Sequence, residues 1–532
     1  MVGCPGCGSK LVYDIGSRKM KCSYCGSSYP VSQVSNRKKN AEESIMEDDS
    51  QMEVTVFTCT QCGGEIIADA DEAVTWCSYC GSPTTLNSRL CRMKKPDTVI
   101  PFQVTKEKCI EKYLTGAKKQ IYAPRDLIQR GKAEGFRGIY MPYWTYTFER
   151  KGSFSFTGTT EEYSDDYKVV TNYKADGNLF SRYEGLSHDA SAAFDDSISE
   201  KIAPFWMSDA VPFDECYLNG FYGDAADQNE KEYEEKMYQV ENELVMSELK
   251  AQFSDIGLNE KQAKNQIAGK QQTTVESSST LNMYPIWFMS YKNGDRVSYA
   301  TVNGQTGRLY ADFPASPARF LLLSLLGAIP IFFLLCLFAT PSPSVVLFLG
   351  LIGAFLMSHS YKKVVEDLFS RRFRIRYGNS SSKKKRVISV NTINSVAYMV
   401  CFVVGMLLCV LADEESFALA DYIGFSLNSI GVAVGGILTI IFLVRFFRMR
   451  SKYIALSGIL LNTTNLFYLA IACITTIVFG INPVEDWAYY TVSLSVIGAL
   501  CVSVYSLIRG YNILSSVQPK QFRRNGGEGF HE

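Results

Sequence analysis

Apolar residues are distributed differently on the two sides of residue 318. Before it, apolar positions form short groups with strand or helix spacing, whereas after it they form runs long enough to cross about 30 Å of hydrocarbon. Six such runs occur, at 320–339, 344–360, 393–412, 425–444, 460–480 and 489–508. We therefore expect an all-α six-helix transmembrane domain at 319–510, followed by a tail at 511–532.

The loops between these runs alternate in charge. The second and fourth loops and the tail carry clusters of Lys and Arg, while the first, third and fifth carry none. Because cytoplasmic loops accumulate Lys and Arg, both termini are predicted to be cytoplasmic. No apolar signal segment is seen at the start, so we expect a multi-pass membrane protein with residues 1–318 in the cytoplasm.

Residues 97–318 have the pattern of a β-rich α+β domain. Aromatic and β-branched residues favour strands, and apolar residues every three or four positions favour helices. Strands are predicted at 99–104, 138–149 and 152–160, a helix at 106–119, an amphipathic helix or helical hairpin at 228–270, and a series of hairpins at 281–310.

The N-terminal region carries a repeated cysteine motif. In each copy two C-x2-C pairs are separated by fourteen residues, and a glycine follows the second cysteine of each pair. Four thiolates suit tetrahedral Zn²⁺, and the glycine lets the backbone turn around the metal. Between the pairs there is room for a short hairpin. The predicted ligands are Cys4, Cys7, Cys22 and Cys25 in one site, and Cys59, Cys62, Cys77 and Cys80 in the other.

These motifs predict zinc ribbons at 1–31 and 54–90 with two Zn²⁺ ions per chain, joined by a flexible charged linker at 32–53. The spacing alone is also compatible with iron held by four thiolates. Disulfides are the less favoured alternative, because they are rare in cytosolic domains. Ribbons of this size cannot build a sufficient core, so the metal should supply most of their folding free energy.

Charge is divided unevenly along the chain. Residues 1–318 contain 35 basic and 44 acidic residues, a net charge of −9, and the remainder contains 19 and 10, a net charge of +9. The first ribbon is basic, with Lys10, Arg18, Lys19 and Lys21 between its cysteine pairs. A basic ribbon could contact phosphates, but the acidic remainder would repel nucleic acid, so nucleic acid is not the favoured partner.

An ordered series of motifs carries a family resemblance. After CPGCG and CSYCG come VIPFQVTKEKCIEKY, IYAPRDL, GIYMPYW, VPFDECYLNGFY, MYPIWFMSY and VNGQTGRLYADFP. Over roughly residues 57–318 the chain resembles bacterial membrane proteins with a transcription-factor-IIB-type zinc ribbon, often labelled primosomal-helicase-like. The resemblance implies a cytoplasmic ribbon and β-rich module anchored by helices, working with flotillin-like or phage-shock-type membrane-stress proteins. A second ribbon and six spans depart from that pattern.

Enzymatic activity is not predicted. The chain lacks G-x4-G-K-[ST], so nothing cradles a nucleoside triphosphate, and NGQTG is interpreted as a turn. His188 and Asp189 resemble half of a catalytic pair, but we expect them in an exposed loop.

Three functional hypotheses follow. The first is a membrane-anchored adaptor that docks cytoplasmic or membrane proteins at the inner face of the bilayer, as a monomer or a homo-oligomer. The second is a membrane-tethered nucleic-acid binder. The third is a transporter or channel with a cytoplasmic regulatory domain, which the absence of Asp, Glu, Lys and Arg within the spans disfavours. The adaptor is preferred.

Overall fold

The computed structural model describes residues 3–35, 50–60, 64–68 and 86–338 with short internal gaps, together with isolated positions at 77–80 and 490–516. Contacts divide them into two compact units. The first holds 3–121 and 125–313, and the second holds 122–124 and the residues from 314 onward.

The second unit is described mainly by one helix. Helix α7 (Pro317–Phe338) covers the first apolar run, and its Phe320 ring lies 5.0 Å from that of Tyr122. No helix among the described residues combines the length and hydropathy expected of a membrane span. Four predicted spans, from 344–360 to 460–480, lie outside the described residues, as do most of the span at 489–508 and most of the tail.

A small antiparallel sheet forms the N-terminal part of the first unit. Its strands are β1 (Leu11–Asp14), β2 (Lys19–Cys22) and β3 (Ser28–Tyr29), with Leu11 opposite Cys22. Lysines alternate with the buried Met20 and Cys22 along β2, so one face is polar and the other packs inward. This is the hairpin that the spacing of the first motif predicts.

An eleven-stranded mixed sheet forms the centre of the first unit. Its main path runs β10-β7-β12-β8-β11-β5-β4-β6, with β9 paired to β8 and β13 paired to β12 and β14. The strands are β4 (Gln51–Cys59), β5 (Glu65–Ile67), β6 (Leu86–Lys94), β7 (Thr98–Val99), β8 (Arg137–Tyr163), β9 (Lys168–Asp189), β10 (Val211–Pro212), β11 (Tyr222–Gly223), β12 (Thr273–Asn293), β13 (Arg296–Asn303) and β14 (Leu309–Ala311).

Helices of 4 to 23 residues accompany this sheet. They are α2 (Lys106–Lys118), α3 (Arg130–Ala133), α4 (Asp196–Ile202), α5 (Glu230–Gln252) and α6 (Glu260–Ala268), with 3-10 turns η1 (Arg125–Ile128), η2 (Met207–Asp209), η3 (Glu215–Leu218) and η4 (Ser254–Ile256). Helix α2 begins where the Thr105 side chain accepts a hydrogen bond from the Lys108 amide, and it buries Cys109, Tyr113 and Ala117 on one face. The predicted helix at 106–119 is confirmed, and 228–270 is a helical hairpin.

Two strand predictions needed correction. The pattern at 99–104 yields only the two-residue strand β7, because Pro101 has no amide hydrogen to donate and the backbone then leaves the sheet, the Gln103 amide bonding to the Gly304 carbonyl. The strands predicted at 138–149 and 152–160 are one continuous strand, β8. Strand β8 continues through Gly152 because Gly152 is paired on both sides, with Leu179 of β9 and with Thr273 of β12.

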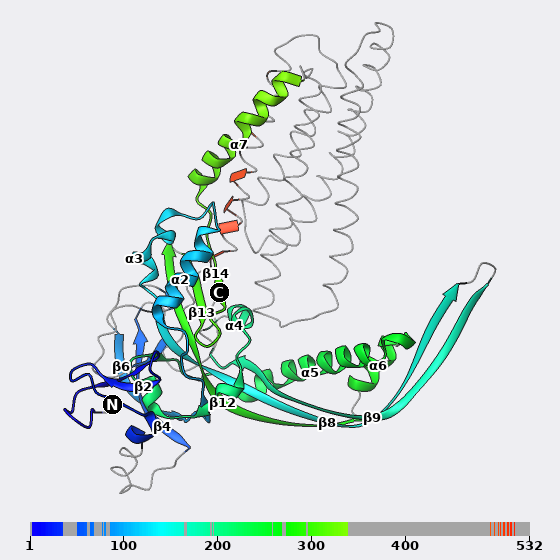
Figure 1. The fold of residues 1–532 in the computed structure, drawn as a ribbon, viewed down its shortest axis with the longest axis horizontal. Helices are drawn as coiled ribbons and strands as arrows, with labels where there is room; N and C mark the ends of the chain where they lie inside the picture. The colour runs from blue at the N-terminus through cyan, green and yellow to red at the C-terminus, as the bar shows by residue number, and fades with distance from the viewer. Residues whose placement is uncertain are drawn as a thin grey trace. The chain divides into compact units, whose positions relative to one another are not determined.

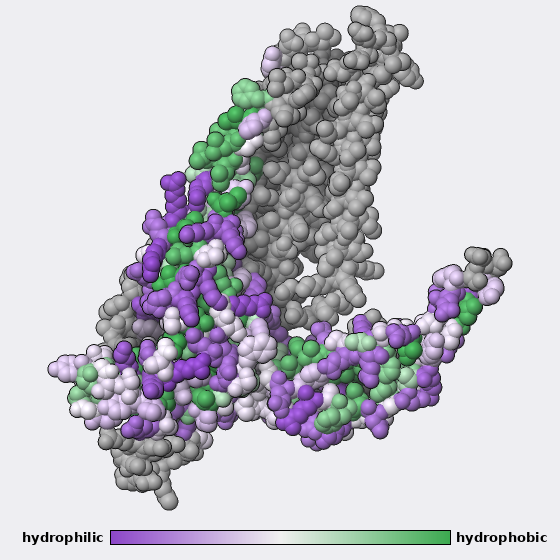
Figure 2. Space-filling model, viewed as in Figure 1, coloured by the Kyte–Doolittle hydropathy of each residue, from purple (hydrophilic) through white to green (hydrophobic). Residues whose placement is uncertain are grey.

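The distal parts of β8 and β9, with α5 and α6, form what we call the arm (Figure 1). Phe156, Val245, Met246 and Ile267 belong to a separate small core between the helices and the strands. Hydrophobic and hydrophilic residues are interspersed on the face of the arm seen in Figure 2.

Within the arm, Arg150 and Glu241 are fully buried, and Arg150 Nη2 lies 2.5 Å from Glu241 Oε2. The sequence predicts only an amphipathic helix or helical hairpin here, so the burial of Glu241 on the inner face of α5 is a finding of the tertiary structure.

Candidate metal centres

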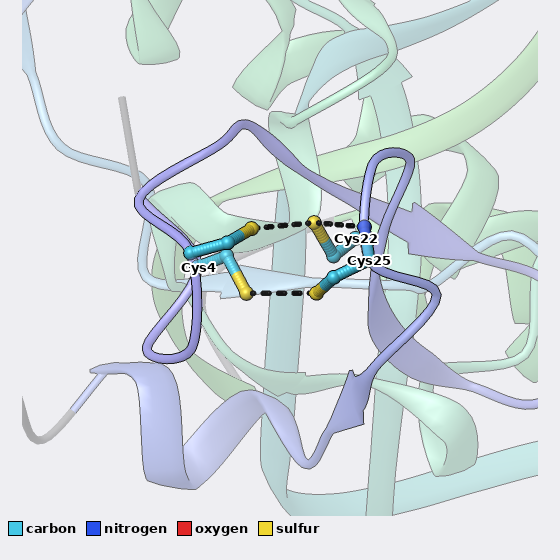
Figure 3. A group of neighbouring side chains, drawn as sticks. Cys4, Cys22 and Cys25 are labelled. Atoms are coloured by element: carbon cyan, nitrogen blue, oxygen red, sulfur yellow. Dashed lines mark hydrogen bonds between the residues drawn. The ribbon is translucent and has the colours of Figure 1, made fainter.

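The first cysteine cluster joins two tight turns of the small sheet. The sulfur atoms of Cys4 and Cys25 lie 3.6 Å apart (Figure 3). Those of Cys7 and Cys22 lie 3.5 Å apart. All four sulfurs lie within 4.8 Å of one another. Thiolates placed tetrahedrally about 2.3 Å from one zinc ion would be separated by about 3.8 Å, so the four residues fit such an ion.

Each turn of this cluster ends on a glycine in the left-handed region. Gly8 and Gly26 have φ values of 75° and 74°, and their amides donate to the carbonyls of Cys4 and Cys22. This conformation carries almost no penalty for glycine. Backbone amides also point at sulfur, as the Cys25 amide does toward Cys22 Sγ at 3.5 Å. Amides of this kind stabilise the negative charge of a bound thiolate.

The environment favours ionised sulfur at the exposed side of the first cluster. Hydrogen bonds with the Ser27 side chain and backbone lower the pKa of the Cys25 thiol to about 6. A backbone hydrogen bond from Ser9 similarly lowers the pKa of Cys7. Because the thiolate is the form that binds metal, these hydrogen bonds favour coordination at Cys25 and Cys7.

The second cluster lies inside the central sheet. Cys59 ends β4, and its sulfur is 3.8 Å from that of Cys80; Cys77 completes the described group, and all three side chains are buried. Cys62, the fourth predicted ligand, lies outside the described residues. The two groups, of four and three cysteines, could each hold a metal ion. No described sulfur pair comes close to the disulfide bond length of about 2.05 Å.

The first cluster is docked on the central domain. The Tyr13 amide donates to the Asn219 carbonyl at 3.1 Å, and the Tyr13 ring lies 5.3 Å from that of Tyr217. Leu11, Met20 and Cys22 belong to the same buried cluster as residues of the central sheet. We expected a tethered ribbon without a core of its own. The described residues of the ribbon instead share a hydrophobic core with the central sheet. Positions 36–49 of the predicted linker lie outside the described part.

Gly220 allows this close approach. Its φ is +90°, and a Cβ atom there would lie 2.3 Å from Val12 Cγ1 of the first ribbon. We predict that Gly220→Ala weakens the docking of the ribbon by about 1–3 kcal/mol, through both strain and overlap. Hydrogen exchange at the Tyr13 amide should accelerate accordingly. Gly131→Ala, where a Cβ would meet nothing within 4 Å, is the matched control. Unchanged exchange in both variants would mean that this contact does not hold the ribbon.

A buried polar group lies directly behind the second cluster. The Ser191 hydroxyl donates to Asp224 Oδ2 at 2.5 Å, and the Tyr79 hydroxyl also bonds to this carboxylate. Burial raises the pKa of Asp224 to about 7, against the lowering effect of these hydrogen bonds. The Tyr79 carbonyl accepts a hydrogen bond from the Tyr299 hydroxyl at 2.9 Å. The knuckle containing Tyr79 is therefore fixed from both sides. Nothing in the cysteine spacing indicates these partners.

His188 and Asp189 are not in an exposed loop, and that prediction was wrong. Both are buried at the end of β9, where the His188 ring stacks 3.8 Å from that of Tyr233 and its Nε2 lies 2.9 Å from Lys236 Nζ. The long pairing of β9 with β8 continues to Asp189 and carries both residues inside. Their position is that of packed residues at the base of the arm.

The NGQTG sequence forms a turn whose side chains fix the backbone of a neighbouring segment. The Asn303 side chain accepts from the amides of Gln305 and Thr306, and its amide group donates to the carbonyls of Ile202 and Pro204. The Gln305 side chain accepts from the Trp206 amide at 2.8 Å and donates to the Trp206 carbonyl at 3.0 Å. Trp206 is thereby held on a fixed backbone while 57% of it stays exposed. Its role could not be read from the sequence.

Comparison with known proteins gives one distant relative. A Bacillus subtilis (strain 168) protein described as "Uncharacterized protein YdjG" is 24% identical over 320 residues, which cover 59% of this chain and 90% of YdjG. The chain is thus a distant homologue of YdjG, and its cysteine clusters are consistent with zinc ribbons. No protein-family model matches the chain, and no solved structure matches it.

Proposed function

We propose that this protein is a zinc-binding, membrane-anchored scaffold that docks protein partners at the cytoplasmic face of a bacterial plasma membrane. In this proposal each cysteine cluster holds one Zn²⁺ ion, with Cys62 as the fourth ligand of the second. The apolar runs at 319–510 and the alternating loop charges support the anchor and its orientation. The exposed leucines at the start of α7 agree with an apolar environment.

The observation that carries docking is the presentation of Trp206. Exposed aromatic residues on preorganised backbone are typical of the few positions that dominate protein interfaces, because little conformational entropy is lost on binding. Gln305 fixes the backbone of Trp206 through two hydrogen bonds, and Gln305 also donates to Asp209 Oδ2 at 2.6 Å. Covering this indole with a partner would remove apolar surface from water while the backbone that carries it is already ordered. Flotillin-like and phage-shock-type membrane proteins are the partner classes that the sequence resemblance suggests.

The test compares partners that co-purify with the full-length chain in mild detergent. We expect Trp206→Ala to reduce the recovery of its main protein partners at least tenfold, since truncating a central interface aromatic has effects of this size. Leu90→Ala removes a side chain that is 68% exposed without this clamp and is the matched control. Gln305→Ala, which frees the loop but keeps the indole, should give an intermediate loss.

Two outcomes would contradict the scaffold. One is an identical set of protein partners in the wild type and Trp206→Ala. The other is recovery of nucleic acid that resists physiological salt, because the exposed Lys19 and Lys21 of the first ribbon would then be the functional surface.

A further inference from the structure

The ends of β8 and β9 extend beyond the helices that cover the rest of the arm. The last contacts with the helical hairpin are made by β8, where the Asn259 amide donates to the Thr157 carbonyl at 2.9 Å and the Thr159 amide to the Gly257 carbonyl at 3.1 Å. Beyond these bonds the two strands continue as a two-stranded ribbon (Figure 1). Pairing in this ribbon runs to Tyr163 opposite Lys168.

This ribbon exposes residues that usually pack. Val169 and Val170 are 42% and 48% exposed, and Tyr163, Tyr167 and Tyr173 are exposed beside them. A two-stranded ribbon alone is marginally stable in water, so additional strands or a packing surface are needed to hold it. A long exposed strand edge is also a template for pairing with another strand.

The available edge belongs to β9. Among the described residues, β8 is the only strand that pairs with β9, from Lys168 to Asp189. Along the distal part of β8, Thr157 and Thr159 already bond to the helical hairpin, which leaves the short edge at 160–163 beyond them. Antiparallel pairing of that short edge with itself would also bring the adjacent Glu161 and Glu162 close to their copies.

The sequence of β9 is complementary in charge to a second copy when the two pair about Asn172. If two copies pair antiparallel about Asn172, Lys168 lies opposite Asp176 of the second copy, and Val169 lies opposite Ala175. Shifting the centre by one residue, to Thr171, would instead place Lys168 opposite Lys174. Opposite charges directly across a strand pair are stabilising and like charges are destabilising, which favours the register about Asn172 over that about Thr171.

We propose that the partner of this edge is a second copy of the chain, with the two β9 strands pairing antiparallel about Asn172 to form a continuous four-stranded ribbon. Backbone hydrogen bonds supply the association. Lys168 and Asp176, which also pair with Glu161 and Lys174 of their own chain, favour the register. This interface involves neither cysteine cluster and does not depend on the proposed scaffold function or on Trp206.

The first test places a new charge on the edge. In the proposed register Val170 lies opposite Lys174 of the second copy, so Val170→Lys creates two like-charge pairs per dimer, whereas Val169→Lys faces Ala175. The two valines are similarly exposed, and each lies opposite a glutamate of its own chain, Val170 opposite Glu161 and Val169 opposite Glu162. Val169→Lys is therefore a matched control for Val170→Lys. By light scattering of the full-length chain in detergent, we expect Val170→Lys to weaken dimerisation about tenfold and Val169→Lys to leave it unchanged.

The second test measures the register. Residues on the two-fold axis have Cα atoms about 4.5–5.5 Å apart, within the range of a disulfide, so Asn172→Cys should form a covalent dimer on mild oxidation. Val170→Cys lies four residues from its own copy, about 13 Å, and should not cross-link above the wild-type background. A monomeric wild type, equal effects of the two lysine variants, or equal cross-linking at both cysteine positions would overturn the proposal.

Discussion

Replacing Cys80 by serine should remove one zinc ion from the purified full-length chain and disrupt the edge of the central sheet. Cys59, Cys77 and Cys80 are buried in the same cluster as Ile139, Tyr284 and other residues of the long strands. Sites with four such ligands contribute about 10–16 kcal/mol of binding free energy, which is available only to the folded state. Without the metal, the knuckle around Tyr79 would lose one of the attachments that hold it in place beside Asp224.

Cys25→Ser should give a milder result. Cys25 is exposed, and its neighbours belong to the first ribbon, so we expect loss of the other zinc ion with the central sheet intact. Metal analysis should therefore give about two ions in the wild type and one in each variant. Circular dichroism and thermal unfolding should separate the variants, with the larger change in Cys80→Ser.

Cys91→Ser is the control for these measurements, because Cys91 is half-buried and belongs to neither cluster. It should retain both ions. Loss of both ions in either cluster variant would indicate one shared cluster in place of two sites, and iron in the purified protein would identify the other metal compatible with the spacing.

Replacing Arg150 by methionine should destabilise the arm by about 3–5 kcal/mol, because it leaves a buried carboxylate without its counter-ion. Arg150 bonds Glu241 through two nitrogens, at 2.9 Å and 2.5 Å, and also donates to the Ile267 carbonyl at 2.7 Å. These contacts join the strand β8 to both α5 and α6. Local unfolding of the two helices, measured by hydrogen exchange in the full-length chain, should become easier by this amount.

The double variant Arg150→Met with Glu241→Leu separates the ion pair from the packing. An apolar pair of similar volume is often as stable as a buried ion pair, so it should recover most of the loss. Arg182→Met, which breaks an exposed ion pair with Glu184 on the same arm, should have little measurable effect. Equal exchange rates in Arg150→Met and Arg182→Met would show that the buried pair does not hold the helices.

Local features of this protein were determined by the sequence itself. The cysteine pairs with their following glycines specify two knuckles, because the turn, the positive φ of Gly8 and Gly26 and the thiol spacing all lie within a few residues. Helix α2 follows from its apolar spacing and from Thr105, and the hairpins of β12, β13 and β14 follow from alternation and turn residues. Each of these depends on neighbours in the chain.

The tertiary structure decided what these pieces pack against. The second cluster is part of the central sheet because β4 pairs with β6 and β5 pairs with β11, and the first is docked because Gly220 admits Val12. His188 and Glu241 are buried although their local sequence is polar. Strand β8 supplies the partner of each, by strand pairing for His188 and through Arg150 for Glu241. Such contacts join segments far apart in the chain, and the free energy that selects them comes from burial and pairing that no local pattern records.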